Sequence, residues 1–266
     1  MTRSIMWQYI EEEPTYLLNI LNNPENKDVI QKVKDFDTIY ICAHGSSYNA
    51  ATSVAGFISD MAHVRVYVYT PSNFKHNAKS IHYENKEKTL VIGISETGTS
   101  RGVLEVLEQM KDKGFTLLTL TNVKDSPMDT LGDHTLYYHC DEEDSNAKTK
   151  GYSCTLLLLM LIGIYSGYFK GFVSNEEVKK YFEELKNEIK NLESLMDSFV
   201  SWLKDASYGK DMKDIYVIGD GYATCIENVN AAEEHTLQGI YDLQGRKLNQ
   251  EPESGIYIKD GKKYVK

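Results

Sequence analysis

The sequence predicts an α/β protein built on a parallel β-sheet with helices on both faces. Short apolar, partly β-branched runs alternate with longer segments of helical periodicity, and this alternation is typical of parallel strands joined by helices. Loops rich in Ser, Thr and Gly follow two of the apolar runs. The hydrophobic content of 41% and the mean hydropathy of -0.42 indicate a chain that folds as a globular protein.

The expected elements follow one another in a regular order. Residues 1–21 have the pattern of an amphipathic helix that Pro14 interrupts, and Ile30–Phe36 completes this lead-in. Five strands then each precede a helix. We expect the strands at Asp37–Ala43, Val64–Tyr69, Thr89–Ile94, Thr116–Thr121 and Thr135–His139. We expect the helices at Tyr48–Met61, Ser72–Ala78, Ser100–Lys113, Ser126–Leu131 and Cys154–Phe169.

The remainder of the chain begins with a long charged helix, Ser174–Lys204, whose apolar residues recur at helical spacing and predict a buried face. Asp214–Ile218 predicts another strand, followed by a Gly-bearing loop and a helix over Tyr222–Thr236. Because this order repeats the first strand–loop–helix unit, we interpret it as the truncated start of a second copy. From Gln238 short alternating segments, with a hairpin signal at Asp260-Gly261, predict antiparallel β ribbons.

These patterns divide the chain into five segments. They are a helical lead-in (1–36), a first α/β lobe (37–172), a linker helix (173–210), the truncated start of a second lobe (211–237) and a β-ribbon tail (238–266).

Composition excludes several classes of function. The net charge of -10 argues against nucleic acid as a partner, since binding to a phosphate backbone needs a basic face. The four cysteines form no CxxC pair and the seven histidines show no metal-ligand spacing, so we expect no metal site and no cofactor. The N-terminus lacks the apolar core of a signal peptide, and the longest apolar run, Thr155–Tyr165, is too short to span a bilayer. We therefore expect a cytoplasmic protein without a membrane partner.

The two hydroxyl-rich loops are the candidate binding site. Leu90–Ile94 turns into a helix through Ser95–Ser100, and Asp37–Ala43 does so through His44–Ser47. Backbone N–H groups at a helix start favour an anion, and ligands of parallel sheets bind at the carboxyl ends of the strands. The two loops therefore predict a phosphate cradle. The alternative is that their Ser and Thr side chains only cap the two helices.

Four segments of the chain also match motifs of a known family. They are Glu11–Leu21 (EEEPTYLLNIL), Ala43–Asn49 (AHGSSYN), Ser95–Ser100 (SETGTS) and Ala147–Tyr152 (AKTKGY). In this order they resemble the E-x-P-x-x-L, G-[TS]-S-Y-N, S-Q-[ST]-G-x-[TS] and S-T-K-[AG]-[FY] motifs of the sugar isomerase (SIS) domain family. The closest likeness is to the isomerase half of glucosamine-6-phosphate synthase and to sugar-phosphate deglycases.

The resemblance implies a flavodoxin-like lobe that binds a phosphorylated sugar. By position, it implies phosphate contacts from Ser47, Ser95, Thr97 and Ser100, with help from Gly98 and backbone N–H groups. It places Ser46 and Glu96 near the phosphate or the sugar hydroxyls, and Thr149 and Lys150 at the border of the pocket.

The resemblance also implies a catalytic helix in the second lobe. Tyr222–Glu234 fits a pattern in which Glu227 and Glu234 are the two family glutamates, seven residues apart and so on one helix face. In the isomerases the second glutamate moves a proton between C1 and C2 of the sugar. Ala231 stands where the synthase has a lysine, which favours a deglycase-like relative. The chain after Thr236 resembles a Bacteroidetes sorting tail instead of a continued lobe, so we expect a truncated or fused product with doubtful turnover.

The leading hypothesis is an isomerase or deglycase that acts on an aminated or glycated hexose 6-phosphate and assembles as a dimer. Two alternatives remain open. One is a sugar-phosphate sensor, although too few residues precede the first strand for a helix-turn-helix domain. The other is a non-catalytic subunit that pairs with an SIS paralogue.

Overall fold

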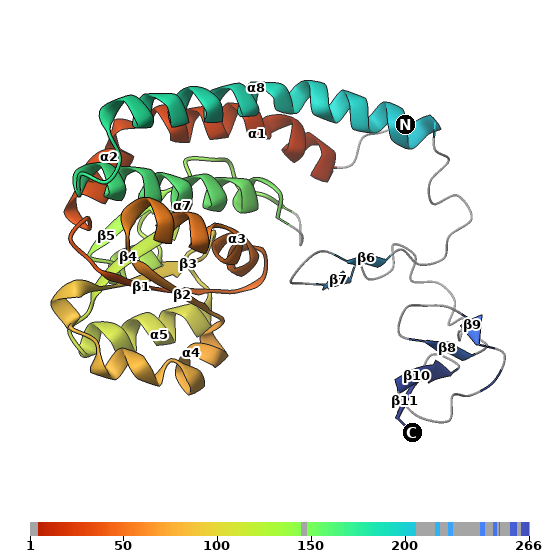
Figure 1. Ribbon diagram of the computed structural model, residues 1–266, viewed down its shortest axis with the longest axis horizontal. Coiled ribbons are helices and arrows are strands. Elements are labelled where there is room, and N and C mark those ends of the chain that lie inside the picture. The colour runs from red at the N-terminus through yellow and green to blue at the C-terminus, as the bar shows by residue number, and fades with distance from the viewer. Residues whose placement is uncertain are drawn as a thin grey trace. The chain divides into compact units, whose positions relative to one another are not determined.

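A computed structural model describes residues 5–144 and 148–205 and the short segments 216–218, 223–225, 240–242, 247–248, 250, 256–259 and 262–265 (Figure 1). The chain divides into two units, Met1–Trp202 and Leu203–Lys266. The first unit holds the parallel sheet and its helices.

Five parallel strands form the sheet of the first unit in the order β2-β1-β3-β4-β5. This arrangement confirms the α/β fold class, because every neighbouring pair is parallel and the strands are joined by helices. The strands are β1 (Thr38–Ala43), β2 (Arg65–Tyr69), β3 (Thr89–Ile94), β4 (Thr116–Thr121) and β5 (His134–Tyr137).

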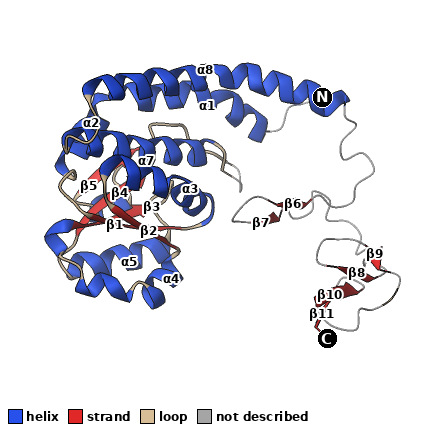
Figure 2. Ribbon diagram, viewed as in Figure 1, coloured by secondary structure: helices blue, strands red, loops and turns tan. Residues whose placement is uncertain are grey.

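Helices cover both faces of the sheet (Figure 2). One face carries α3 (Gly45–Ala62) and α7 (Lys150–Phe169), and outside them lie α1 (Ile5–Asn22), α2 (Pro24–Lys32) and α8 (Asn175–Asp205). The other face carries α4 (Pro71–Asn77), α5 (Arg101–Asp112) and α6 (Pro127–Leu131). Two short 3-10 turns, Lys79–Tyr83 and Lys86–Lys88, lead into β3.

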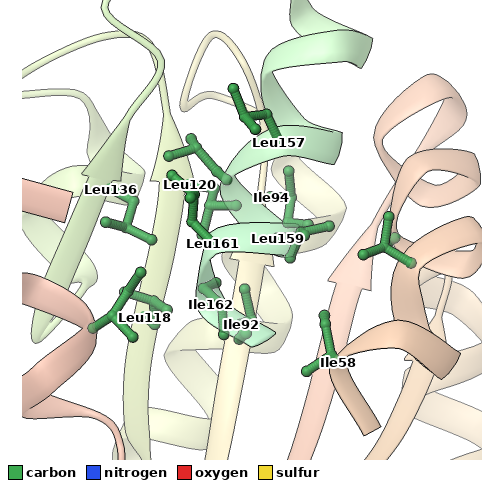
Figure 3. Packing of buried hydrophobic residues seen from close by; sticks show 14 of the residues in the cluster. Ile58, Ile92, Ile94, Leu118, Leu120, Leu136, Leu157, Leu159, Leu161 and Ile162 are labelled. Carbon is green, nitrogen blue, oxygen red and sulfur yellow. The ribbon is translucent and has the colours of Figure 1, made fainter. Parts of the chain in front are cut away.

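Alternate residues of each strand point to opposite faces and so build two cores. Ile92 and Ile94 of β3 pack with α7 residues such as Leu159 (Figure 3), whereas Val91 belongs to the cluster that contains Val106 of α5. Because helices cover both faces, the strands read as continuous apolar runs, which is why the sequence located them well.

Helix α7 is long and apolar enough, by length and composition alone, to cross a membrane. In the structure 61% of its most apolar window is buried, and the helix contacts α3, α1 and α2. The apolar run is thus explained by burial in the core of the first unit.

Two features of the lead-in differ from expectation. Helix α1 does not break at Pro14 but runs through it, with Pro14, Leu17 and Ile20 buried. Packing of this face against α7 offsets the hydrogen bond that proline cannot make. The sequence analysis also missed α2, whose start is a side-chain cap from Asn23 followed by Pro24 at the first helical position.

After the end of α8, the described residues of the second unit form short antiparallel strands. β6 (Tyr216–Ile218) pairs with β7 (Ala223–Cys225), and a separate sheet has the order β11-β10-β8-β9. The latter contains β8 (Ile240–Asp242), β9 (Lys247–Leu248), β10 (Ile256–Lys259) and β11 (Lys262–Val265). Lys259 pairs with Lys262 in the antiparallel register of β10 and β11, as an antiparallel ribbon requires, while the predicted turn at Asp260-Gly261 lies outside the described residues.

The helix predicted over Tyr222–Thr236 is wrong at its beginning. Ala223–Cys225 is a strand, because antiparallel pairing with Tyr216–Ile218 supplies its backbone partners locally. Glu227 and Glu234 lie outside the described residues, so their predicted catalytic roles stay predictions.

Candidate functional site

The loops after β1 and β3 leave the sheet side by side. Ala43 and Ile94, the last residues of these strands, are partners in the parallel register. The first turn of α5 also approaches the β1 loop, since a Cβ atom on Gly102 would lie 3.3 Å from His44 Nε2. The structure therefore brings the two predicted loops together at the carboxyl edge of the sheet.

The start of α3 is open. His44 holds the N-cap position without a side-chain hydrogen bond to the helix, and Gly45 enters the first turn with φ of 54°. A Cβ atom on Gly45 would meet nothing within 4 Å, so space remains before this turn. Ser46 and Ser47 lie half-buried in the same turn, as the phosphate-loop hypothesis requires.

The start of α5 also lacks a side-chain cap. Ser100 is its N-cap residue but makes no side-chain cap. Ser95 is buried at the end of β3, whereas Thr97 and Thr99 are exposed, with their hydroxyl oxygens 2.8 Å apart. These hydroxyls form a polar patch at the mouth of the loop.

Side-chain caps on other helices offer a comparison for the two loops. Helices α2, α4 and α6 are capped by Asn23, Thr70 and Ser126, each of which accepts a backbone N–H bond. These three helices therefore have side-chain caps at their N-termini, whereas α3 and α5 do not. The side chains at the N-cap positions of α3 and α5 therefore do not act as caps, which leaves these helix starts as candidates for an anion.

Gly98 shapes the β3 loop. Its φ is 67°, and a Cβ atom there would lie 2.1 Å from Ser126 Oγ, so only glycine fits against the start of α6. Its N–H donates to the Ser95 carbonyl at 3.0 Å, and its carbonyl accepts from the Met128 N–H. Gly98 thus sets the conformation of the loop, and its N–H is engaged by the Ser95 carbonyl.

Helix α7, unlike α3 and α5, has an anion from the chain itself at its start. Glu143, 2% exposed, accepts backbone N–H bonds from Thr149, Lys150 and Gly151 at 2.9, 3.1 and 2.9 Å. The Thr149 hydroxyl donates to the same carboxylate at 2.6 Å. Burial works against ionisation of Glu143, but these hydrogen bonds outweigh it and lower its pKa.

Lys150, predicted to border the pocket, points to α1. Its side chain is fully buried, with Nζ 2.6 Å from Glu12 Oε2. Nζ also lies 4.6 Å and 4.8 Å from the ring centres of Tyr9 and Tyr16. Thr149 and Lys150 therefore place their polar atoms on Glu143 and Glu12, and the structure does not bring those atoms to the two loops.

Glu96 turns from the β3 loop toward the start of α7. Its Oε1 lies 3.6 Å from Lys148 Nζ, and its side chain is 10% exposed. Oε2 is buried without a hydrogen-bond partner among the described residues, and a Cβ atom on Gly151 would lie 2.6 Å from it. Burial raises the pKa of Glu96, with Lys148 opposing the shift and Glu143 adding to it.

Sequence reasoning missed three polar residues of this region: Thr99, Glu143 and Lys148. Thr99 occupies the variable position of the loop motif. Glu143 belongs to an acidic run just before a helix, which is a signal that could have identified it, because carboxylates are favoured at helix N-termini. Lys148 lies beside Lys150, and only the structure separates a buried lysine from one that is 25% exposed.

A metal centre finds no support within the described ranges, where no group of three or more His, Cys, Asp or Glu side chains could hold an ion. The two loops instead place hydroxyl groups around two helix N-termini without side-chain caps, and such a set of donors suits an oxyanion.

Comparisons with known proteins concern the family and the fold of the chain. The SIS domain family pattern matches residues 32–165, half of the chain. The chain is 28% identical over 227 residues to the glutamine–fructose-6-phosphate aminotransferase [isomerizing] of Oceanobacillus iheyensis, and the match covers 80% of this chain but 37% of the relative. The chain thus spans little more than a third of that protein's length.

Solved structures share the fold. A Clostridium difficile 630 protein assigned as a phosphosugar isomerase superimposes with a TM-score of 0.71 at 26% identity, covering 77% of this chain and 57% of that one. The C-terminal domain of glucosamine-fructose-6-phosphate aminotransferase from Francisella tularensis has a TM-score of 0.69 at 22% identity, covering 80% and 61%. The second likeness concerns the fold alone.

Proposed function

Because the chain belongs to the SIS domain family, we propose that it binds a phosphorylated sugar at the carboxyl edge of its parallel sheet, between the β1 and β3 loops. One observation carries the proposal: α3 and α5 begin side by side without side-chain caps. Their N-terminal backbone N–H groups and helix dipoles favour a phosphate dianion there.

The hydroxyl side chains supply the remaining donors. A phosphate ester offers only acceptor oxygens to neutral donors, and each of Ser47, Thr97 and Ser100 has one O–H to give. Ser95 lies deepest, at the end of β3, and completes the proposed phosphate set. Ser46 shares its turn of α3 with Ser47 and is proposed to contact the phosphate or the sugar hydroxyls.

The proposed chemistry is that of the sugar-phosphate isomerase and deglycase class, on an aminated or glycated hexose. Glu234 acts as the base that moves a proton between C1 and C2, and Glu227, seven residues before it in the sequence, is the second catalytic glutamate. Support comes from the name of the Oceanobacillus relative and from the role assigned to the Clostridium protein. We also propose a cytoplasmic homodimer, or a complex with an SIS paralogue, which light scattering of the purified protein would test.

Calorimetric titration tests the binding step directly. The full chain is titrated with fructose 6-phosphate and glucosamine 6-phosphate, and in parallel with fructose and glucosamine. We expect saturable binding of the phosphorylated compounds only, because the two loops supply phosphate donors. Ser95→Ala combined with Thr97→Ala should weaken binding by about 3 kcal/mol or more, since hydrogen bonds to charged groups are worth about 1.5–3 kcal/mol each.

A matched control separates the loop from the surface in general. Ser53 lies exposed on α3, two turns from its start, so Ser53→Ala should leave affinity unchanged. Absence of binding for every phosphorylated sugar tried, glycated amino-acid 6-phosphates included, would overturn the proposal. The catalytic step is tested by exchange of the C2 proton with deuterated solvent, which Glu234→Gln should abolish without loss of binding.

A further inference from the structure

Lys148 and Glu96 form an ion pair beside the β3 loop that neither the loop motif nor the fold explains. We propose that Lys148 is a ligand-binding cation of the sugar-phosphate site and that Glu96 is its counter-ion in the unliganded protein, not a phosphate contact. The inference rests on the proposed function, which supplies the dianion. Its geometric basis is the 3.6 Å separation of Lys148 Nζ and Glu96 Oε1, an ion pair between the start of α7 and the loop that joins β3 to α5.

Glu96 is unsuited to hold a phosphate. An ionised carboxylate has only acceptor oxygens, as has a phosphate dianion, so the two groups repel each other. The Glu96 side chain also packs against the protein itself. Its Oε2 packs against Gly151 in the first turn of α7, where a Cβ atom would come within 2.6 Å of it.

Lys148 is placed to reach a ligand. Its side chain is 25% exposed, whereas the Lys150 side chain is fully buried on Glu12. Arg101, which follows the β3 loop, is occupied by Glu105 at 3.0 Å on the outer face of α5. Lys148 Nζ also donates to the Glu143 carbonyl at 2.5 Å, which holds the ammonium at the start of α7 beside Glu96.

The pair explains how an acidic chain accommodates a dianion. The chain carries a net charge of -10, and Glu96 and Glu143 both lie at the start of α7. When Lys148 turns to a phosphate, Glu96 loses its partner while Oε2 remains buried and unpaired. The groups that act on Glu96 are then Glu143, Lys150 and Tyr138, and loss of the Lys148 charge raises the pKa of Glu96 further.

Two single substitutions should change the affinity for a sugar phosphate in opposite directions. Lys148→Gln should weaken fructose 6-phosphate binding about ten- to a hundredfold, the worth of a charge-assisted hydrogen bond, and Lys148→Arg should retain most of it. Glu96→Gln should strengthen binding by about threefold or more, because it removes the competitor for Lys148 and a like charge near the dianion. Glutamine has nearly the same shape as glutamate, so this variant keeps the packing against Gly151.

Controls of equal charge change are Lys190→Gln on exposed α8 and Glu142→Gln in the acidic run, and both should bind as the wild type does. Thermal melting confirms that each variant folds. If the wild type binds fructose 6-phosphate and Lys148→Gln binds it equally well, the inference is overturned while the proposed function stands. Weaker binding by Glu96→Gln would also overturn it, since Glu96 would then be a ligand contact. Failure of the wild type to bind is the separate result that removes the proposed function.

Discussion

The N-terminus of α7 and the N-termini of α3 and α5 differ in how their unpaired backbone N–H groups are treated. At α7 the chain supplies its own anion, because Glu143 accepts three backbone N–H bonds and a hydroxyl bond, and its pKa is lowered. At α3 and α5 no side-chain cap is present. All three helix starts have N–H groups that favour a negative charge, and only at α7 does a side chain of the protein supply that charge.

This difference teaches how to separate stability from binding. A helix start that is satisfied within the chain contributes to folding in every state of the protein. A start without such a partner contributes less to folding, and its backbone donors can bind a ligand. Glu143 at α7 therefore serves as an internal reference for what a bound anion would do at α3 and α5.

The largest effect is expected at the filled start. Glu143→Ala should lower the free energy of unfolding by about 3 kcal/mol, because it removes a buried anion that satisfies three backbone donors. Since the pKa of Glu143 is lowered in the folded state, its stabilisation is present above the unfolded value and is lost as pH falls through the folded one. Urea unfolding at neutral and at acid pH measures both effects. Glu142→Ala at the exposed neighbouring position is the control, and an equal loss there would break the comparison.

The next effect is expected at an open start and should appear in binding instead of stability. Thr97→Ala combined with Ser100→Ala should weaken fructose 6-phosphate binding by about tenfold or more, while the free energy of unfolding stays within about 0.5 kcal/mol of wild type. Ser100 makes no cap in the folded protein, so folding loses little. Calorimetry and urea unfolding on the same samples check the two parts. A large loss of stability would show that these hydroxyls cap the helix after all.

The capped start of α4, which follows the neighbouring strand β2, should show the reverse pattern, with an effect on stability and none on binding. Thr70 follows β2 and accepts the Asn73 N–H, so Thr70→Ala should cost about 1 kcal/mol of stability and leave sugar-phosphate affinity unchanged. Reduced affinity without reduced stability would place Thr70 in the ligand site and extend that site to a third loop.

The smallest effect concerns pH. Burial raises the pKa of Glu96, so acidification neutralises this carboxyl earlier than an ordinary one. The affinity advantage of Glu96→Gln over wild type should therefore shrink toward onefold as the pH falls, and should do so at a higher pH than for an ordinary glutamate. Titration of the phosphate itself cancels in this ratio. A ratio that stays constant with pH would show that Glu96 does not compete with the ligand.

The sequence by itself determined the sheet and the position of the loops. Strands buried on both faces leave continuous apolar runs, and β3 at Thr89–Ile94 and β4 at Thr116–Thr121 were predicted to the residue. The Ser, Thr and Gly residues of SETGTS follow a strand directly, so their place at the edge of the sheet follows from the topology. Hydrophobic periodicity and the residue types of a loop are local properties, so they can be recognised in the sequence of a single segment.

Only the tertiary structure decided which polar groups are free. Lys148 and Lys150 are two residues apart, yet one is partly exposed beside Glu96 and the other is enclosed by Glu12, Tyr9 and Tyr16 of α1. Likewise, Ser100 and Ser126 both hold N-cap positions, but only Ser126 makes the cap. The continuation of α1 through Pro14 also depends on packing against α7. Burial and partner choice depend on segments far apart in the sequence, and so they appear only when the chain is folded.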